Sequence, residues 1–277
     1  MQGSDSMLVH LETLFQLVCR SVSSQNGKKH KIAGVNAKGD CVRWFDLVAD
    51  EQVASYFKER FPSPVQLLSE EEAPRRFGSG EPKFIVVVDP VDGSDNLARR
   101  IPPYGLAVAL IPASCSIDVA SVQFALVGDF CTGRSWVAAR GSGASRNGSP
   151  IRTSRVTRLE DALISCELNH FSPELLFSSL LSEAGGVRTF GCATQALCLV
   201  AAGSVDAHLD LRGRLTPENF LAPSLILTEA GGVITDPEGK PLPAIQSLTE
   251  RYSIVAAATP ELHAALVERL QKGEITR

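Results

Sequence analysis

The sequence lacks the long apolar run, the basic leader and the paired cysteines that mark membrane-spanning and secreted proteins. No apolar stretch approaches the roughly 18 residues that a membrane span needs. The first residues, MQGSDSM, carry no basic region, so we expect no signal peptide. The seven cysteines are odd in number and form no C-x-x-C pair, which favours reduced thiols and a cytoplasmic protein.

The sequence also has little excess charge of either sign. Lys and Arg number 27 against 31 Asp and Glu, the net charge is −4, and the two signs are interspersed. A nucleic-acid or anionic-membrane surface would need clustered basic residues, so neither partner is expected. With 44% hydrophobic residues in 277, the chain has the composition of a globular protein and enough length for a large core.

Several common phosphate and metal motifs are absent as well. There is no G-x-x-x-x-G-K-[ST], and the strand-like IVVVD (85–89) is followed by proline rather than by G-x-G-x-x-G. These absences exclude a P-loop and a dinucleotide fingerprint. The stretch D-P-V-D-G-S-D lacks the phase of an EF-hand loop and the D-x-D of a haloacid-dehalogenase nucleophile.

Apolar periodicity and breakers predict a strand-rich first half and an alternating second half. In the first half we expect helices at 8–22 and 46–60 and strands at 65–68, 83–88, 104–111, 117–126 and 134–139. After the turn cluster 141–150 we expect strands at 162–167, 187–190, 205–211, 233–235 and 252–257, and helices near 173–184, 194–202, 219–230 and 260–271. This order predicts an α+β subdomain over 1–150 and an α/β subdomain over 151–277.

Acidic residues follow the predicted strands. VQLL closes on S-E-E-E, and KFIVVV closes on D-P-V-D-G-S-D-N (89–96). Asp-Pro and Asp-Gly are common turn dipeptides, so one such stretch alone would indicate only a turn. However, ligands bind at strand ends in α/β sheets, and oxygen donors without Cys or His suit Mg²⁺ or Mn²⁺. Gly93 and Ser94 would open a helix whose N–H groups attract phosphate, which together predicts metal-assisted phosphoryl chemistry.

These motifs resemble those of the inositol monophosphatase superfamily of Mg²⁺-dependent, lithium-sensitive sugar phosphatases. Its first signature is similar to D-P-[IVL]-D-G-[ST]-x-N, which residues 89–96 match, and its second is similar to an acid followed by E-A-G-G, here in TEAGGVITD (228–236). The spacing around FDLVADEQ and DLRGRLTPEN looks most like the archaeal branch, whose members hydrolyse both inositol monophosphate and fructose 1,6-bisphosphate. The resemblance implies the layered αβαβα sandwich of that family.

The resemblance also implies a metal site in the first subdomain. The metal, Mg²⁺ or Mn²⁺, would be held by Glu70, Asp89, the Val91 carbonyl, Asp92 and Asn219. Bound metal lowers the pKa of a water molecule, so the protein side chains need no large shift of their own.

Further positions would complete catalysis. Ser94 stands where the family usually has Thr, and its hydroxyl, oriented by Asp46, would position and help deprotonate the attacking water. Glu70 and Asp92 would complete the catalytic set, and the amides of Gly93 and Ser94 would hold the phosphate.

Two of these assignments keep an alternative. Asp50 also lies in a V-A-D context and competes with Asp46, which could instead simply cap its helix. Glu71 competes with Glu70, because an insertion after Pro62 would shift the register by one residue.

Sugar or polyol contacts would come from the second subdomain. Together with Gly93 and Ser94, the substrate-binding residues would be Gly191, Cys192, Ala193, Asp210 and Arg212. We expect Cys192 to be a small buried residue rather than a nucleophile, because no His lies near it in sequence. Arg212 and Arg188 would meet a second phosphate and favour a bisphosphate, or else both are solvated surface arginines.

The second signature departs from the family pattern. The family has W-D where this chain has Glu218-Asn219, and Asn keeps an oxygen donor but loses the charge. Glu218 is not expected to replace it, because adjacent helix residues point about 100° apart. The chain would therefore be an active phosphomonoesterase for a sugar, polyol or adenosine bisphosphate, or a phosphate-binding regulatory relative with weakened catalysis. The resemblance also implies a homodimer.

Overall fold

The computed structural model describes residues 2–24, 32–36, 38–39, 41–171 and 175–271. Its α-helices are α1 (Gln2–Ser23), α2 (Trp44–Glu59), α3 (Ser94–Arg99), α4 (Leu175–Glu183), α5 (Ala193–Ala201), α6 (Pro217–Glu229) and α7 (Pro260–Gln271). Short 3₁₀ turns lie at η1 (Val119–Ser121) and η2 (Leu159–Asp161). None of the described helices is long and apolar enough to cross a membrane.

The larger sheet comes from the first half of the chain, after a hairpin of β1 (Ile32–Val35) and β2 (Cys41–Arg43). Its strands are β3 (Val65–Ser69), β4 (Arg75–Phe77), β5 (Phe84–Asp92), β6 (Gly105–Pro112), β7 (Phe124–Asp129), β8 (Ser135–Ala139), β9 (Ala144–Arg146) and β10 (Ser149–Pro150). Their spatial order is β10-β9-β8-β7-β6-β5-β3-β4. Only β3 and β5 run parallel here, so their carboxyl ends reach the same edge.

The smaller sheet comes from the second half. Its strands are β11 (Leu163–Cys166), β12 (Gly186–Arg188), β13 (Ala207–Leu215), β14 (Val233–Thr235) and β15 (Tyr252–Ala257), in the order β12-β11-β13-β15-β14. β11 pairs parallel with β12 and β13, whereas β15 pairs antiparallel with β13 and β14.

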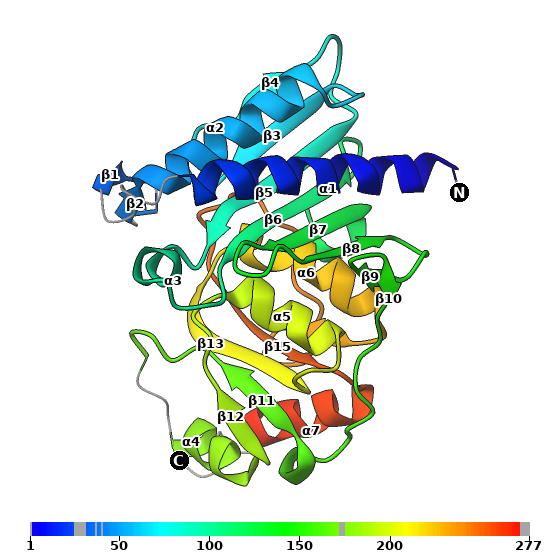
Figure 1. Cartoon of the computed structure of the whole chain (residues 1–277). Helices are drawn as coiled ribbons and strands as arrows, with labels where there is room; N and C mark the ends of the chain where they lie inside the picture. The colour runs from blue at the N-terminus through cyan, green and yellow to red at the C-terminus, as the bar shows by residue number, and fades with distance from the viewer. Residues whose placement is uncertain (1, 25–31, 37, 40, 172–174, 272–277) are drawn as a thin grey trace.

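Helices alternate with the sheets in layers, which Figure 1 shows from top to bottom. α1 and α2 cover one face of the larger sheet, α5 and α6 lie between the two sheets, and α4 and α7 cover the far face of the smaller sheet. The predicted layered αβαβα sandwich, mixed α+β and α/β, is therefore confirmed.

The continuous β-branched run of β5 follows from this layering. Val86 and Val88 pack into the cluster that contains the apolar faces of α1 and α2, whereas Val87 packs into the cluster that contains α5 and α6. Because both faces of the strand are buried, its sequence does not alternate with polar residues. This burial fixes the position of the acidic segment where β5 ends.

One predicted strand, 117–126, is wrong in its first half. The turn η1 occupies this segment, and β7 begins only at Phe124. The cause is Asp118: its Oδ1 accepts the N–H of Ser121 at 2.7 Å, and its Oδ2 accepts the hydroxyl of Ser116 at 2.6 Å. Such local side-chain bonds offer the backbone an alternative to sheet pairing.

Other helix and strand boundaries differ from the predicted ones by smaller amounts. The first helix begins at Gln2 rather than near residue 8, and β13 continues to Leu215 rather than ending at 211. The helix predicted near 173–184 is α4, and its predicted start at Pro173 lies outside the described residues. The strands β1, β2 and β4 were not predicted, and β9 and β10 lie within the predicted turn cluster 141–150.

The division of the chain at residue 150 stays a prediction. The larger sheet ends at Pro150, and the smaller sheet begins after it. One hydrophobic cluster nevertheless joins Val87 and Ala107 of the larger sheet to Phe220 of α6 and Ile254 of β15. The two parts therefore share a core.

Candidate active site

A cavity of about 170 Å³ opens where β3 and β5 end. It is lined by Asn36, Cys41, Glu70, Glu71, Asp89, Val91, Asp92, Gly93, Ser94 and Asn219. The strand register explains the gathering, because Ser69, the last residue of β3, pairs with Val88, so that Glu70 follows β3 beside Asp89 of β5. Every position expected to hold a metal lines this cavity.

Asp89 is the most enclosed acid of the cavity, with 1% of its surface exposed. Its Oδ1 accepts the N–H of Val91 at 2.9 Å, and its Oδ2 accepts the amide of Asn219 at 2.7 Å. Burial raises its pKa well above the usual range, and the charges of Glu70 and Asp92 raise it further. Acids crowded in this way favour a cation that restores the balance of charge.

Asp92 connects the end of β5 to the start of α5. Its Oδ2 accepts the N–H of Thr194 at 2.8 Å and the thiol of Cys192 at 3.1 Å. Cys192 is buried, as expected, and burial raises its pKa well above the usual range. The thiol therefore stays protonated and acts as a donor, which agrees with the prediction that it is not a nucleophile.

Glu70 and Glu71 both line the cavity. Glu70 pairs with Lys38, whose Nζ lies 2.8 Å from Glu70 Oε1. Glu71 Oε2 is buried and has no hydrogen-bond partner among the described residues. Burial first, and then the charges of Glu70 and Asp46, raise the pKa of Glu71 to about 8. Glu70 remains our proposed ligand, because it follows β3 directly beside Asp89.

Ser94 and Asp46 lie in contact although one begins α3 and the other lies in the first turn of α2. Ser94 Oγ is 2.8 Å from Asp46 Oδ1 and 2.9 Å from the Val91 carbonyl oxygen. Asp46 Oδ2 accepts the N–H of Arg43 at 2.7 Å, so this carboxylate also caps its helix. Burial raises the pKa of Asp46 to about 7, although the bonds from Arg43 and Ser94 lower it.

Asp50 lies in a different environment. It accepts the hydroxyl of Ser69, and its Oδ2 pairs with Arg75 at 2.8 Å. Of the two alternatives, the structure therefore brings Asp46, and not Asp50, against Ser94.

The start of α6 carries the departure from the signature. Asn219 donates its amide to Asp89, as described above. Glu218 is 2% exposed, and its Oε1 contacts both Lys38 Nζ and the hydroxyl of Thr216. Burial first, and then the charge of Glu70, raise the pKa of Glu218 to about 7. Glu218 was not expected to act at this site, yet its side chain reaches the same acidic cluster through Lys38.

The residues expected to contact a sugar lie on the other side of Asp92. Gly191 has φ of +64°, and its N–H donates to Glu167 Oε1 at 3.0 Å. Asn96 of the first signature donates its amide to the Phe190 carbonyl at 2.7 Å. Cys192 and Ala193 follow at the start of α5.

Asp210 and Arg212 form a bidentate pair that does not line the cavity. Arg212 Nε lies 2.9 Å from Asp210 Oδ1, and Nη2 lies 2.6 Å from Oδ2. Arg212 is therefore not a solvated surface arginine, but its charge is already neutralised by a fully buried carboxylate. Arg188, in contrast, is exposed. The expected meeting of these two arginines with a second phosphate receives no support from this geometry.

Sequence reasoning missed two groups near the site. Glu167 is buried, and burial raises its pKa to about 7, although Arg212 lowers it. It directly follows β11, so the strand-end signal that found the other acids would have found it too. Lys38 lies in the turn between β1 and β2 without any motif, and only the fold places it among acids.

The second signature also holds the turn cluster that was predicted at 141–150. Glu229 of E-A-G-G accepts the N–H groups of Gly141 and Gly143, each at 2.7 Å. Both glycines have positive φ, which confirms a turn rather than a phosphate loop. Glu229 therefore acts away from the acidic cavity.

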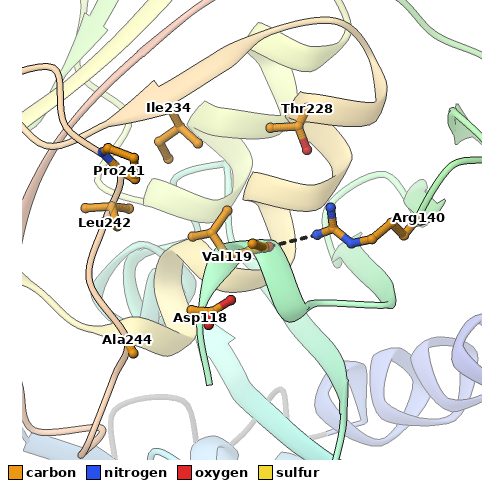
Figure 2. Close-up of a pocket in the computed structure, with 9 residues that line it drawn as sticks. Asp118, Val119, Arg140, Thr228, Ile234, Pro241, Leu242 and Ala244 are labelled. Atoms are coloured by element: carbon orange, nitrogen blue, oxygen red, sulfur yellow. Dashed lines mark hydrogen bonds between the residues drawn. The ribbon is translucent and has the colours of Figure 1, made fainter. Parts of the chain in front are cut away.

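A larger cavity of about 440 Å³ lies beside the end of α6 and shares no lining residue with the acidic cavity. Its lining is largely apolar (Figure 2). The cationic Arg140 at its edge is held by the carbonyls of Val119 and Val122, each at 2.8 Å. None of the predicted site residues lies here.

The donors of the acidic cavity suit a divalent cation. They are carboxylates and a backbone carbonyl, the hard oxygens that Mg²⁺ and Mn²⁺ prefer, and one buried oxygen of the lining, Glu71 Oε2, has no hydrogen-bond partner in the described chain. Within that described part, no three Asp, Glu, His or Cys side chains already form a cage for a metal ion. Instead, Lys38 donates to Glu70 and Asn219 donates to Asp89.

Comparisons with known proteins agree with this arrangement. A family model described as the inositol monophosphatase family matches residues 7–274. A fructose-1,6-bisphosphatase/inositol-1-monophosphatase of Methanothermobacter thermautotrophicus is 32% identical over 246 residues, 87% of each chain. A bifunctional NADP phosphatase/NAD kinase of Methanococcus maripaludis is 28% identical, over 87% of this chain and 44% of that protein.

Solved structures agree as well. An inositol monophosphatase–fructose 1,6-bisphosphatase superposes with a TM-score of 0.81 at 25% identity, covering 94% of this chain and 98% of that one. The family match spans nearly the whole chain, and the Methanothermobacter relative is 32% identical over most of it. The chain belongs to the inositol monophosphatase family.

Proposed function

We propose that this protein is a phosphoric monoester hydrolase that uses Mg²⁺, or alternatively Mn²⁺, to cleave a small sugar or polyol phosphate. One observation carries the proposal: Glu70, Asp89, Val91, Asp92 and Asn219 line one cavity, although they come from three separate parts of the chain. The names of the archaeal relatives, which include fructose-1,6-bisphosphatase and inositol-1-monophosphatase, support it.

These same residues would hold the metal. When bound, it would polarise a phosphoryl oxygen and lower the pKa of the attacking water. The protein's part is to keep the ligands in place. Val91 N–H fixes Asp89, and Thr194 N–H fixes Asp92, so neither carboxylate has to reorganise during the reaction.

Ser94 and Asp46 would handle the proton of the attacking water. The Ser94 hydroxyl lies 2.8 Å from Asp46 Oδ1, so Ser94 can accept a proton from water as it donates its own to this carboxylate. An Asp with a pKa near 7 is ionised in part of the molecules at neutral pH and can still take up a proton. The amides of Gly93 and Ser94 would hold the phosphate.

The sugar or polyol would lie between the start of α5 and Asp210. Gly191 is held on both sides, because its N–H donates to Glu167 and Asn96 donates to the preceding carbonyl. Arg212 is paired with Asp210, which favours recognition of hydroxyl groups over a second phosphate. Fructose 1,6-bisphosphate remains a substrate candidate through the relatives' names, and adenosine bisphosphate or NADP through the NADP phosphatase relative.

A second candidate function is a phosphate-binding regulatory protein with weak catalysis, which Asn219 favours because it lacks the charge of an acid. A panel assay separates these functions: phosphate release is measured side by side from inositol 1-phosphate, fructose 1,6-bisphosphate, adenosine 3′,5′-bisphosphate and NADP. Release from inositol 1-phosphate supports the enzyme, and binding without release from any ester supports the regulatory protein. The homodimer and the cytoplasmic location stay predictions.

A further inference from the structure

The turn between β1 and β2 inserts an ammonium group between two carboxylates of the candidate site. Lys38 Nζ lies 2.8 Å from Glu70 Oε1, contacts Glu218 Oε1, and lies 3.2 Å from Thr216 Oγ1. The exposed fractions of the side chains are 5% for Lys38, 17% for Glu70 and 0% for Glu218. The ion pair is thus largely shielded from water.

These contacts make a cation position built only from oxygen atoms. An ammonium has three N–H donors, and Lys38 directs them to three oxygens that come from the end of β3 and the start of α6. Glu218 Oε2 is buried beside it with no hydrogen-bond partner among the described residues. A buried carboxylate with one unsatisfied oxygen has capacity for a further cationic ligand.

Glu70 belongs to two sets of contacts. It pairs with Lys38, and it lines the cavity beside Asp89 and Asp92. A divalent ion that approaches Glu70 meets the charge of Lys38, which repels it at short range. Metal binding through Glu70 therefore requires Lys38 to give up this contact.

We propose that Lys38 is a tethered cation that competes with the divalent metal for Glu70 and Glu218, and thereby lowers the metal affinity of the site. The inference rests on the proposed function in taking Glu70 as a metal ligand. It adds a role for Glu218, whose counter-ion is Lys38 before the metal binds and the metal afterwards. Together with the neutral Asn219, Lys38 would give this protein a weaker metal site than a cavity with only acids.

The direct test measures Mn²⁺ binding by calorimetry on the purified full chain without substrate. We expect Lys38→Met to lower the dissociation constant by about tenfold or more, because a like charge beside the ion is removed. Lys58→Met is the matched control, since Lys58 is exposed on α2 and its loss changes the net charge equally. An affinity of Lys38→Met equal to or weaker than wild type overturns the inference.

Two further measurements cover a variant that folds poorly without the ion pair. Lys38→Met/Glu218→Gln removes both buried charges and should bind Mn²⁺ more tightly than Glu218→Gln, in which Lys38 still contacts Glu70. In the wild-type protein, Mn²⁺ should speed the modification of Lys38 by an amine reagent, followed by mass spectrometry, and leave Lys58 unchanged. Slower or equal modification of Lys38 argues against displacement.

These experiments distinguish a failure of the role proposed for Lys38 from a failure of the proposed function. A wild-type protein that releases phosphate, with Lys38→Met unchanged in Mn²⁺ affinity, would refute the role of Lys38 alone. Absence of Mn²⁺ binding in every variant, together with absence of phosphate release, would refute both.

Discussion

The end of β5 and the start of α6 meet at one hydrogen bond, from the Asn219 amide to Asp89 Oδ2. At the end of β5, the acids are positioned by backbone donors, Val91 N–H for Asp89 and Thr194 N–H for Asp92. At the start of α6, the acid is Glu218, and its partner is the side chain of Lys38. In the first region backbone donors hold the proposed ligands in place, whereas in the second the side chain of Lys38 occupies the position that we propose a metal takes.

The largest expected effect comes from removing an acid of the first region. Asp89→Asn should lower kcat/KM by more than about 100-fold, because even partners outside the ligand shell of a metal contribute 10- to 100-fold. Initial rates of phosphate release measure it. Asp95→Asn is the matched control, because Asp95 lies in the same signature but is 79% exposed and should leave the rate unchanged. Equal activity of the two variants would show that Asp89 at the end of β5 takes no part in the reaction.

The next effect tests the proton path beside β5. Ser94→Ala should lower kcat by about 100-fold with a smaller change in KM, because the contact with Asp46 is lost. Ser94→Thr keeps the hydroxyl and should retain most of the rate. If the alanine variant keeps the wild-type kcat, the hydroxyl has no part in catalysis.

A smaller effect concerns the substrate side. Arg212→Leu should raise KM about tenfold for inositol 1-phosphate and fructose 1,6-bisphosphate alike, because it leaves the buried Asp210 without its partner. Arg188→Leu, at an exposed arginine, should change neither value. A loss confined to the bisphosphate would show that Arg212 binds a second phosphate, against the pairing described here.

The smallest expected effect is on how stability changes with pH. It distinguishes the contribution of His208, on the strand β13 that leads to α6, from that of the acidic cluster. His208 is fully buried, and burial lowers its pKa to about 4. Between about pH 6.5, the pKa of His in the unfolded chain, and pH 4, the unfolded chain binds a proton at His208 and the folded chain does not. The stability that comes from burying the neutral His208 is therefore complete above about pH 6.5 and is lost as pH falls toward 4. Acids with raised pKa values, such as Asp46, act with the opposite sign.

Comparison of wild type with His208→Gln isolates this term. Between about pH 7.5 and pH 5.5, the free energy of unfolding of wild type should fall by about 1 kcal/mol more than that of the variant. Urea unfolding at both pH values measures it. Parallel changes in the two proteins would assign the pH dependence to the acidic cluster instead.

The two regions also differ in how far the sequence predicts them. The D-P-V-D-G segment directly follows a β-branched run and matches the family signature, so its acids could be placed from the strand-end pattern together with the resemblance. The choice of Asp46 over Asp50 needed the contact of α2 with α3, and Lys38 could not be found because its partners lie far away in sequence. The strand at 117–126 failed for a local reason, since the Asp118 side chain forms competing bonds. Long-range contacts of single side chains thus remain beyond sequence patterns.

The most direct test of the central claim is phosphate release from inositol 1-phosphate as Mg²⁺ is titrated, for wild type and Asn219→Asp. We predict that release depends on Mg²⁺ and that Asn219→Asp reaches half-saturation at about tenfold lower Mg²⁺, because a charged ligand replaces an amide. No release by either protein at Mg²⁺ concentrations of about tens of millimolar, far above what carboxylate sites require, would contradict the account.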